Sequence, residues 1–151
     1  MSVSREGVAR PPSQLTFMLV EFHRTFDILC NRHPTLDVPD DVADLRRALL
    51  DEEVDELKEA LAAGDLVGVA DALADIAHVV AGTAVTFGID LDLVLAEVHR
   101  SNMTKLGPGG RPVKSPAGRV LKGPGYVRPE IESLLSGQPA LPVGRPSRRP
   151  S

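Results

Sequence analysis

The sequence predicts an all-α fold, a four-helix-type bundle followed by a Gly/Pro-rich basic C-terminal loop. Hydrophobic residues make up 42% of the 151 residues, but aromatic residues make up only 3% and tryptophan is absent. The core must therefore be built from Leu, Val, Ile and Ala, which favours helices packed on helices. Four successive segments also repeat their apolar residues with the period of an amphipathic helix. At this length, one domain with a proper core is the simplest expectation.

Each of the four segments has residues that can cap or end a helix. The first, "SQLTFMLVEFHRTFDIL", starts at Ser13, whose hydroxyl can accept from a free N–H of the first turn. Glycines that end the later helices can adopt the left-handed conformation common there. These later segments, with their expected caps and ends, are "DDVADLRRALLDEEVDELKEALAAG" (Asp40 or Asp41, Gly64), "LVGVADALADIAHVVAGTAVTFG" (Asp65, Gly88) and "LDLVLAEVHRSNMTKLG" (Asp90, Gly107).

The two ends of the chain differ in composition from the helical segments. We expect residues 1–12 to be a disordered leader and residues 136–151 a disordered, Pro-rich basic tail, which leaves residues 13–135 as the domain. The last part of that domain is rich in Gly, Pro and basic residues. There, "PVK" and "RVLK" around "SPAG" predict a small β-hairpin, with a simple loop as the alternative.

Charge and composition exclude several classes of function. The net charge of −4 gives no reason to expect a nucleic-acid partner. Cys30 is the only cysteine, so an intramolecular disulfide and a Cys-based zinc site are excluded. The N-terminal segment lacks the apolar core of a signal peptide, and the longest apolar stretch, Ile76 to Ile89, is too short to cross a bilayer. We therefore expect a cytoplasmic protein without a membrane partner.

The stretch "LLDEEVDELKEAL" in the second helix carries six acidic residues within nine positions. With about 100° per residue, Asp51 and Asp55 lie opposite the apolar stripe, where solvation explains them. Glu52, Glu53 and Glu56 do not join that solvated group. Glu53 and Glu56 instead share an arc with apolar residues at the edge of the core, so part of the acidic run is expected to point inward.

The third helix is apolar or small on nearly every side, which is typical of a buried helix. Asp71, Asp75, His78 and Gly82 interrupt it at spacings of four, three and four, so they lie along one face. An unpaired buried carboxylate costs several kcal/mol and needs a partner. A hard divalent cation, Mg²⁺ or Mn²⁺, would supply one. Ordinary capping, ion pairs or an oligomer contact remain alternatives, and His78 is more simply a hydrogen-bonded core histidine.

Polar residues after the third helix form a second candidate group. Asn102 follows Leu91, Leu95 and Val98 on the expected core-facing stripe of the fourth helix, and Lys105 comes one turn later. A buried Asn needs a partner, which a base edge, a phosphate oxygen or a neighbouring helix would provide. The remaining candidates lie in the loop that follows and are Lys114, Arg119, Lys122 and Tyr126. The three basic residues either close over phosphates as a mobile flap or belong to a solvated loop, and Tyr126 either stacks on a base or anchors the loop.

"EEVDE" followed by "DALADIAHVVAGTA" resembles the EExxE…ExxD pattern of the all-α nucleoside triphosphate pyrophosphohydrolases. These are the MazG-like proteins, grouped with phosphoribosyl-ATP pyrophosphohydrolase and the dimeric dUTPases. The resemblance continues through "SNMTK" and "GRVLKGPGY" and covers roughly residues 17–132. The chain departs from the pattern at Ala72, where the Glu of ExxD would stand if Asp75 is its Asp. Asp71 is the candidate replacement.

The resemblance implies a Mg²⁺-dependent hydrolase that acts on nucleoside triphosphates and clears dUTP or non-standard nucleotides. Water would attack the α-phosphorus and release a nucleoside monophosphate and pyrophosphate. It also implies a homodimer or homotetramer. The roles carried over by position are metal ligation by Glu53, Glu56 and Asp75, with Asp71 as a further ligand; a second ion or the catalytic base at Glu52; and substrate binding by Asn102, Lys105, Lys114, Arg119, Lys122 and Tyr126.

Two other functions remain possible on sequence grounds. The first is a helical module that binds nucleotides or proteins and has lost activity through the change at Ala72. The second is a carboxylate-bridged bundle for redox chemistry or metal storage. That class carries Glu-x-x-His pairs, and this sequence contains none. The sequence does not distinguish dUTP, a damaged nucleotide and phosphoribosyl-ATP, because all three need the same phosphate chemistry.

Overall fold

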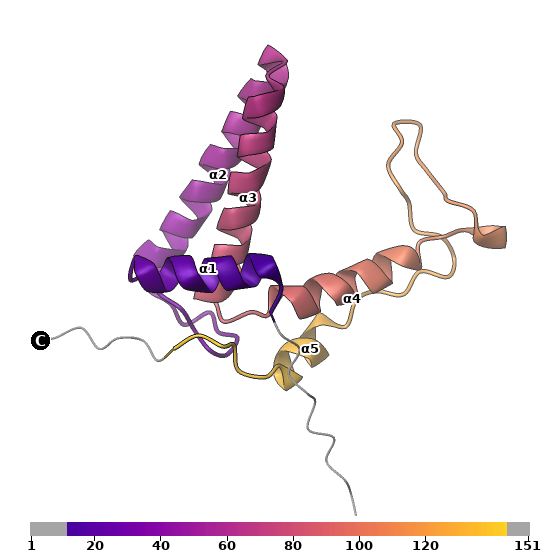
Figure 1. Cartoon of the computed structure of the whole chain (residues 1–151). Helices are drawn as coiled ribbons and strands as arrows, with labels where there is room; N and C mark the ends of the chain where they lie inside the picture. The colour runs from indigo at the N-terminus through magenta and orange to yellow at the C-terminus, as the bar shows by residue number, and fades with distance from the viewer. Residues whose placement is uncertain (1–11, 145–151) are drawn as a thin grey trace, which may run out of the picture. The chain divides into compact units, whose positions relative to one another are not determined.

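The computed structural model describes residues 12–144, so most of the expected leader and the last part of the expected tail lie outside the described residues. Figure 1 shows the helices within this range. Across these residues the structure contains helices and one isolated antiparallel bridge, Lys114 to Val120, and no strand. The all-α prediction is confirmed. The helices are α1 (Gln14–Thr25), α2 (Asp40–Ala63), α3 (Leu66–Thr86), α4 (Leu91–Met103), the short 3₁₀ helix η1 (Pro108–Gly110) and α5 (Ile131–Gly137).

Local capping explains most of the helix boundaries. The side chain of Ser13 accepts a hydrogen bond from the N–H of Thr16, and Asp65 and Asp90 cap α3 and α4 in the same way. Gly64 ends α2 with a φ of +67°, as its sequence position predicts. The expected cap of α2 is wrong. Pro39 occupies the N-cap position, and Asp40 and Asp41 lie inside the first turn, where their charge still favours the helix N-terminus.

The described chain forms two compact units, residues 12–89 with 139–144, and residues 90–138. In the first unit, α2 and α3 lie side by side along their length, and α1 packs against α3. The buried apolar residues of this unit are Leu19 and Val20 from α1, Ala72, Val79, Ala81, Ala84 and Val85 from α3, and Leu141 and Val143 from the C-terminal segment.

Residues 136–144, which we predicted to start a disordered tail, belong to the folded chain. Ser136 and Gly137 complete α5. Leu141 and Val143 are only 3% and 4% exposed, and the N–H of Leu141 donates to the carbonyl of Arg32 at 2.8 Å. The alternation of apolar residues in this Pro-rich segment lets every second side chain enter the core of the first unit, as in a strand without a sheet.

A buried polar cluster lies where α1, α2 and α3 meet. His23 and Arg46 are 1% and 7% exposed. Arg46 donates from Nε to the hydroxyl of Thr83 and from Nη2 to the carbonyl of Val79, both at 3.0 Å. Gly82 lies against these two side chains: a Cβ there would be 2.7 Å from Nη2 of Arg46 and 2.9 Å from Nε2 of His23. The glycine therefore permits the close approach of α1 and α2 to α3.

Replacing Gly82 by valine is expected to lower the free energy of unfolding by about 1–3 kcal/mol, because the added carbons overlap two buried side chains. Ala74→Val is the matched control, since Ala74 is exposed on the same helix. It should cost no more than the helix-propensity difference of roughly 0.5 kcal/mol. Urea unfolding of both variants measures the difference, and equal losses would contradict the packing assigned to Gly82.

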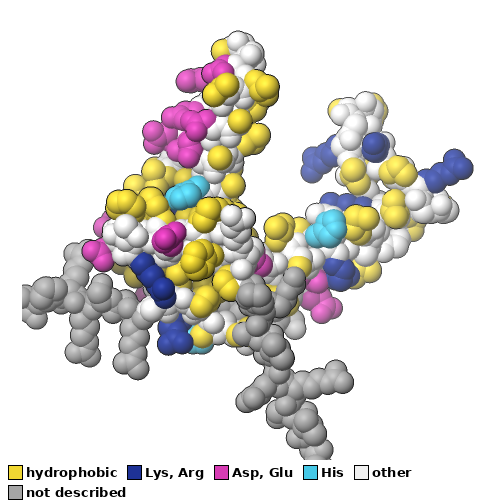
Figure 2. All heavy atoms as spheres, viewed as in Figure 1, with side chains coloured by type: hydrophobic (Ala, Val, Ile, Leu, Met, Phe, Trp, Pro, Cys, Tyr) yellow, Lys and Arg dark blue, Asp and Glu magenta, His cyan; other side chains and the backbone are white. Residues whose placement is uncertain are grey.

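The prediction that the third helix is a buried helix is wrong for part of the surface of α3 in the described chain. Leu66, Val67 and Leu73 are 80%, 79% and 53% exposed, because α1 and α2 cover only part of the helix. Phe17 and Phe22 of α1 and Phe26, its C-cap residue, are exposed as well. Figure 2 shows hydrophobic side chains gathered over α1 and along α3, with acidic side chains along α2. By length and mean hydropathy (1.5) α3 would also pass as a membrane-crossing helix, a test that core helices pass too.

The second unit consists of α4, a long loop and α5. The loop folds back on itself in a short hairpin, in which the N–H of Leu121 donates to Val113 at 2.8 Å and the N–H of Ser115 donates to Arg119 at 2.9 Å. Of the two sequence alternatives, a small hairpin or a simple loop, the structure shows the hairpin. Helix α5 was not expected, since its seven residues are too few for a periodic pattern.

Candidate metal centre

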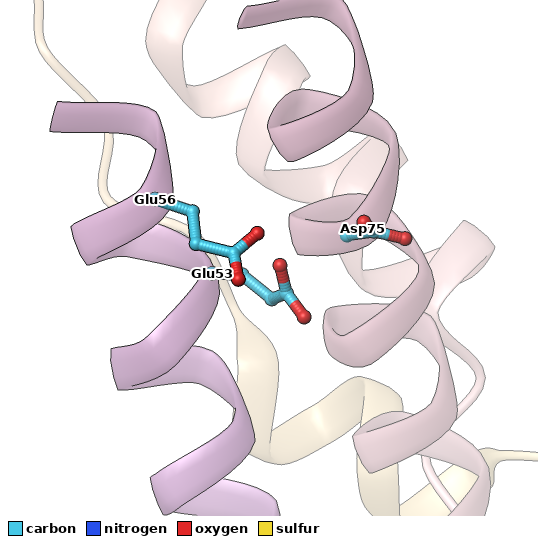
Figure 3. Close-up of side chains that lie close together, drawn as sticks. All are labelled: Glu53, Glu56 and Asp75. Carbon is cyan, nitrogen blue, oxygen red and sulfur yellow. The ribbon is translucent and has the colours of Figure 1, made fainter. Parts of the chain in front are cut away.

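Three carboxylates from two helices meet in the first unit. Glu53 and Glu56 are three residues apart on α2, so their side chains project from the same face. Asp75 projects from the facing side of α3, as Figure 3 shows. One oxygen from each of the three carboxylates lies within 4.8 Å of the others. Glu53 and Asp75 are half-buried and Glu56 is exposed, so the group is reachable from solvent.

Glu53 is the most constrained member of this group. Its Oε2 atom is buried and has no hydrogen-bond partner among the described residues. Burial raises the pKa of its carboxyl, and the nearby charges of Glu56, Asp75 and Glu52 raise it further. The salt bridges found among the described residues involve Asp44, Asp55 and Glu97 and none of these carboxylates. Within residues 12–144 the group therefore concentrates negative charge without a salt bridge to balance it.

The donor set fits a hard divalent cation. All three candidate ligands supply carboxylate oxygens, which Mg²⁺ and Mn²⁺ prefer, and no sulfur or imidazole belongs to the group. The buried, unpartnered oxygen of Glu53 is the specific feature that a cation would satisfy.

Comparison with known proteins identifies the family. A family model described as phosphoribosyl-ATP pyrophosphohydrolase matches residues 19–102, more than half of the 151 residues. The chain belongs to this family. The match runs from α1 into α4 and includes all three carboxylates. The family is part of the MazG-like superfamily of all-α nucleoside triphosphate pyrophosphohydrolases, so the resemblance is confirmed and the chain is a pyrophosphohydrolase in class. A search of curated proteins found no match.

The remaining acidic residues of the family pattern lie outside the group. Glu52 and Asp71 are exposed, and neither belongs to the cluster that the structure brings together. Ala72, which would stand at the Glu position of ExxD if Asp75 is its Asp, is only 2% exposed. With that correspondence, a small buried side chain replaces the carboxylate of the pattern. The solvated half of the acidic run is as expected, with Asp55 paired to Lys58 at 2.7 Å on the surface.

The six predicted substrate-binding residues all lie in the second unit, whereas the carboxylates lie in the first. Asn102 is exposed, although we placed it on a core-facing stripe, and Leu95 of that stripe is 61% exposed. The buried residue is its neighbour Ser101, 1% exposed, whose hydroxyl donates to the carbonyl of Val127 in the returning chain at 2.7 Å. Nζ of Lys122 lies 4.6 Å from the centroid of the Tyr126 ring, within the range of a cation–π contact.

Sequence reasoning missed three polar residues that the structure makes prominent. Arg46 is seven residues before Glu53 and so shares its inward arc, a signal that was not used, whereas nothing in the spacing of Glu97 separates it from a solvated charge such as Glu59. Ser101 was not singled out because Asn102 beside it lies on the predicted core-facing stripe and has a side-chain amide that needs hydrogen-bond partners. Helical periodicity gives the angle of a side chain, but only the path of the neighbouring segments decides which angle becomes buried.

Proposed function

We propose that this protein is a Mg²⁺-dependent nucleoside triphosphate pyrophosphohydrolase, which converts a (d)NTP and water to the (d)NMP and pyrophosphate. The observation that carries the proposal is the convergence of Glu53, Glu56 and Asp75, with one Glu53 oxygen buried and unpartnered. The family match supports the same class of reaction.

In the proposed reaction, the water oxygen forms a bond to the α-phosphorus while the bond from that phosphorus to the α–β bridging oxygen breaks. Pyrophosphate leaves, and the water proton passes to a carboxylate. Glu53, Glu56 and Asp75 would hold Mg²⁺, which offsets the charge of the triphosphate and lowers the pKa of water. Glu52, one residue before Glu53 and exposed, is our candidate for the base or for the ligand of a second ion. Asp71, also exposed, is the candidate further ligand.

Binding of the triphosphate needs positive charge in addition to the metal, since carboxylates alone repel a polyanion. Our candidate for this charge is the basic loop of the second unit. Figure 2 shows basic side chains around the loop that follows α4. We propose that this loop binds phosphate oxygens and that Asn102 and Tyr126 contribute polar and ring contacts. The residues assigned to the phosphates are Lys105, Lys114, Arg119 and Lys122.

The experiment that tests this function is a panel of nucleotides assayed with Mg²⁺ and with Mn²⁺. The panel includes dUTP, the standard and several oxidised triphosphates, and phosphoribosyl-ATP. We expect dUTP or a non-standard nucleotide to give monophosphate and pyrophosphate in a metal-dependent reaction, in keeping with removal of unwanted nucleotides. Release of no pyrophosphate from any member with either metal would contradict the proposal.

A second candidate is a catalytically impaired nucleotide- or protein-binding module. The buried Ala72 favours it, because one carboxylate of the family pattern is missing. The same panel separates the two functions. An impaired module would bind a triphosphate in the presence of Mg²⁺, as measured by calorimetry, and would leave it intact.

We also propose a homodimer or homotetramer. The support is the amount of apolar surface on the first unit, where α1 and α3 expose large side chains such as Phe17 and Leu73, 61% and 53% exposed. Exposed apolar patches of this kind mark interaction surfaces. Light scattering on the purified chain measures the assembly, and a monomer at micromolar concentration would contradict this part of the proposal.

A further inference from the structure

Three polar side chains follow one another along a single face of α4. Glu97, Ser101 and Thr104 are spaced by four and three residues, so they form one line. All three bond to the chain that returns from the basic loop. Ser101 donates to the carbonyl of Val127 at 2.7 Å, the N–H of Val127 donates to Thr104 Oγ1 at 2.8 Å, and the N–H of Glu130 donates to Glu97 Oε1 at 2.9 Å.

The hydrogen bonds made by these three side chains are strong, so they fix the returning chain to α4. Arg100 donates twice to Glu97, at 2.8 and 2.6 Å. These bonds, and the backbone bond from Glu130, lower the pKa of the Glu97 carboxyl to about 2, so it is ionised at any working pH. Hydrogen bonds to an ionised acceptor are shorter and stronger than neutral ones. Ser101 is almost fully buried, so its bond to Val127 cannot be exchanged for water without cost.

The loop between these anchors is closed at its base. The N–H of Gly123 donates to the carbonyl of Lys105 at 3.1 Å, one residue after the last anchor on α4. A Cβ on Gly123 would lie 2.5 Å from the carbonyl oxygen of Leu106, so a glycine is needed for the two chain segments to approach. The chain thus leaves α4 at Lys105 and is fixed again at Val127.

The closed loop carries charge of only one sign. Between Glu97 and Glu130 the sequence contains no acidic residue. From residue 105 to residue 128 it contains six basic ones, namely Lys105, Arg111, Lys114, Arg119, Lys122 and Arg128. Like charges held in one loop repel and favour an extended, variable loop unless the backbone is constrained. The anchors on α4 supply that constraint at both ends.

We propose that Glu97, Ser101 and Thr104 are positioning residues that hold the basic loop in place for binding a triphosphate. They act through the backbone of residues 127–130 and do not touch the substrate. This inference rests on the proposed function. The proposed function needs positive charge near the phosphates, and the inference adds that this charge lies on a loop that is already ordered before binding. An ordered loop loses less conformational entropy when the triphosphate binds.

Thr104→Val and Thr104→Ser form the matched pair that tests the proposal. Valine has the shape of threonine but removes both the acceptor for Val127 and the donor to the carbonyl of Ser101 at 2.7 Å. Serine keeps both. With the best substrate of the panel, we expect Thr104→Val to raise KM about tenfold, as for the loss of roughly 1.4 kcal/mol of binding, with kcat within about twofold of wild type. Thr104→Ser should restore the wild-type KM.

Hydrogen exchange at the amides of residues 105–127 gives a readout that does not depend on activity. We expect faster exchange there in Thr104→Val than in Thr104→Ser, with α2 and α3 unchanged. Wild-type KM together with wild-type exchange in Thr104→Val would overturn the proposal. Equal changes of kcat and of KM in Thr104→Val and Thr104→Ser would also overturn it. If Thr104→Val does not fold, Glu97→Gln replaces it, since glutamine keeps the shape but removes the charge that strengthens the bonds from Arg100 and from the Glu130 N–H, and the same changes in KM and exchange are expected.

The two proposals can fail separately. If the wild-type chain hydrolyses no triphosphate, the proposed function fails, and the positioning role is then decided by two measurements. These are the exchange of residues 105–127 and the affinity for a non-hydrolysable triphosphate analogue with Mg²⁺. Faster exchange and weaker binding in Thr104→Val support the positioning role, and wild-type values for both overturn it.

Discussion

Replacing Glu53 by glutamine is expected to reduce hydrolysis by at least about a hundredfold. Glutamine has nearly the same shape, but it lacks the charge that makes the group a ligand for Mg²⁺. The apo protein should not be destabilised, because Glu53 is half-buried, its Oε2 atom has no hydrogen-bond partner among the described residues, and the charges of Glu56 and Asp75 disfavour its ionised form. Loss of activity with an unchanged or higher melting temperature in the absence of metal is therefore the expected combination. Pyrophosphate release measures the activity, and thermal unfolding without metal measures the melting temperature.

Variants of the same helix supply the controls. Asp55 lies on the solvated side and pairs with Lys58, so Asp55→Asn should retain activity within about twofold. Asp75→Asn should behave like Glu53→Gln, since both carboxylates belong to the same candidate metal site. Full hydrolysis by Glu53→Gln or by Asp75→Asn would rule out the metal site described above.

Acidification from pH 7 to pH 4 is expected to lower the free energy of unfolding by about 3 kcal/mol through His23 alone. Burial lowers the pKa of His23 from 6.5 to about 4, and the positive charges of Arg46 and His78 act in the same direction. Its Nδ1 lies 3.3 Å from the carbonyl of Leu29, and its Nε2 is buried without a partner among the described residues. The fold therefore holds the neutral imidazole.

The sign follows from the depressed pKa of a base. Below pH 6.5 the unfolded chain binds a proton at this position that the folded chain does not bind until about pH 4. The stabilisation is complete above pH 6.5 and is lost as the pH falls through this window. Urea unfolding at pH 7, 5.5 and 4.5 measures it for wild type and His23→Gln. Removal of the exposed His99 should leave the slope unchanged, whereas an equal slope in wild type and His23→Gln would contradict the assignment.

The sequence predicted the four long helices because their signals are local. Periodic apolar residues and capping side chains such as Ser13 and Asp65 act within one or two turns. Features that depend on contacts between distant segments were not predicted. Leu141 and Val143 enter the first unit from a segment that looked like a Pro-rich tail. Asn102 was placed inward because the apolar residues of α4 were assumed to face the chain's own core.

Of the candidate site, the sequence predicted the three carboxylates that the structure brings together, and the roles of the other candidate residues stay predictions. Glu53 and Glu56 could be separated from Asp51 and Asp55 by helical angle alone. The choice between Asp71 and Asp75 could not be made in this way, because both lie on one face of α3. That choice depends on which turn of α3 lies beside Glu53 on α2, and the structure places Asp75 there.

The most direct test of the central claim is hydrolysis in ¹⁸O-labelled water with Mg²⁺ and the best substrate of the panel. Attack at the α-phosphorus places the label in the nucleoside monophosphate and leaves the pyrophosphate unlabelled, which mass spectrometry of the two products measures. For wild type we predict labelled nucleoside monophosphate and unlabelled pyrophosphate. For Glu53→Gln we predict that neither product forms at an appreciable rate. Label in the pyrophosphate, or labelled products formed equally well without a divalent cation, would contradict the account.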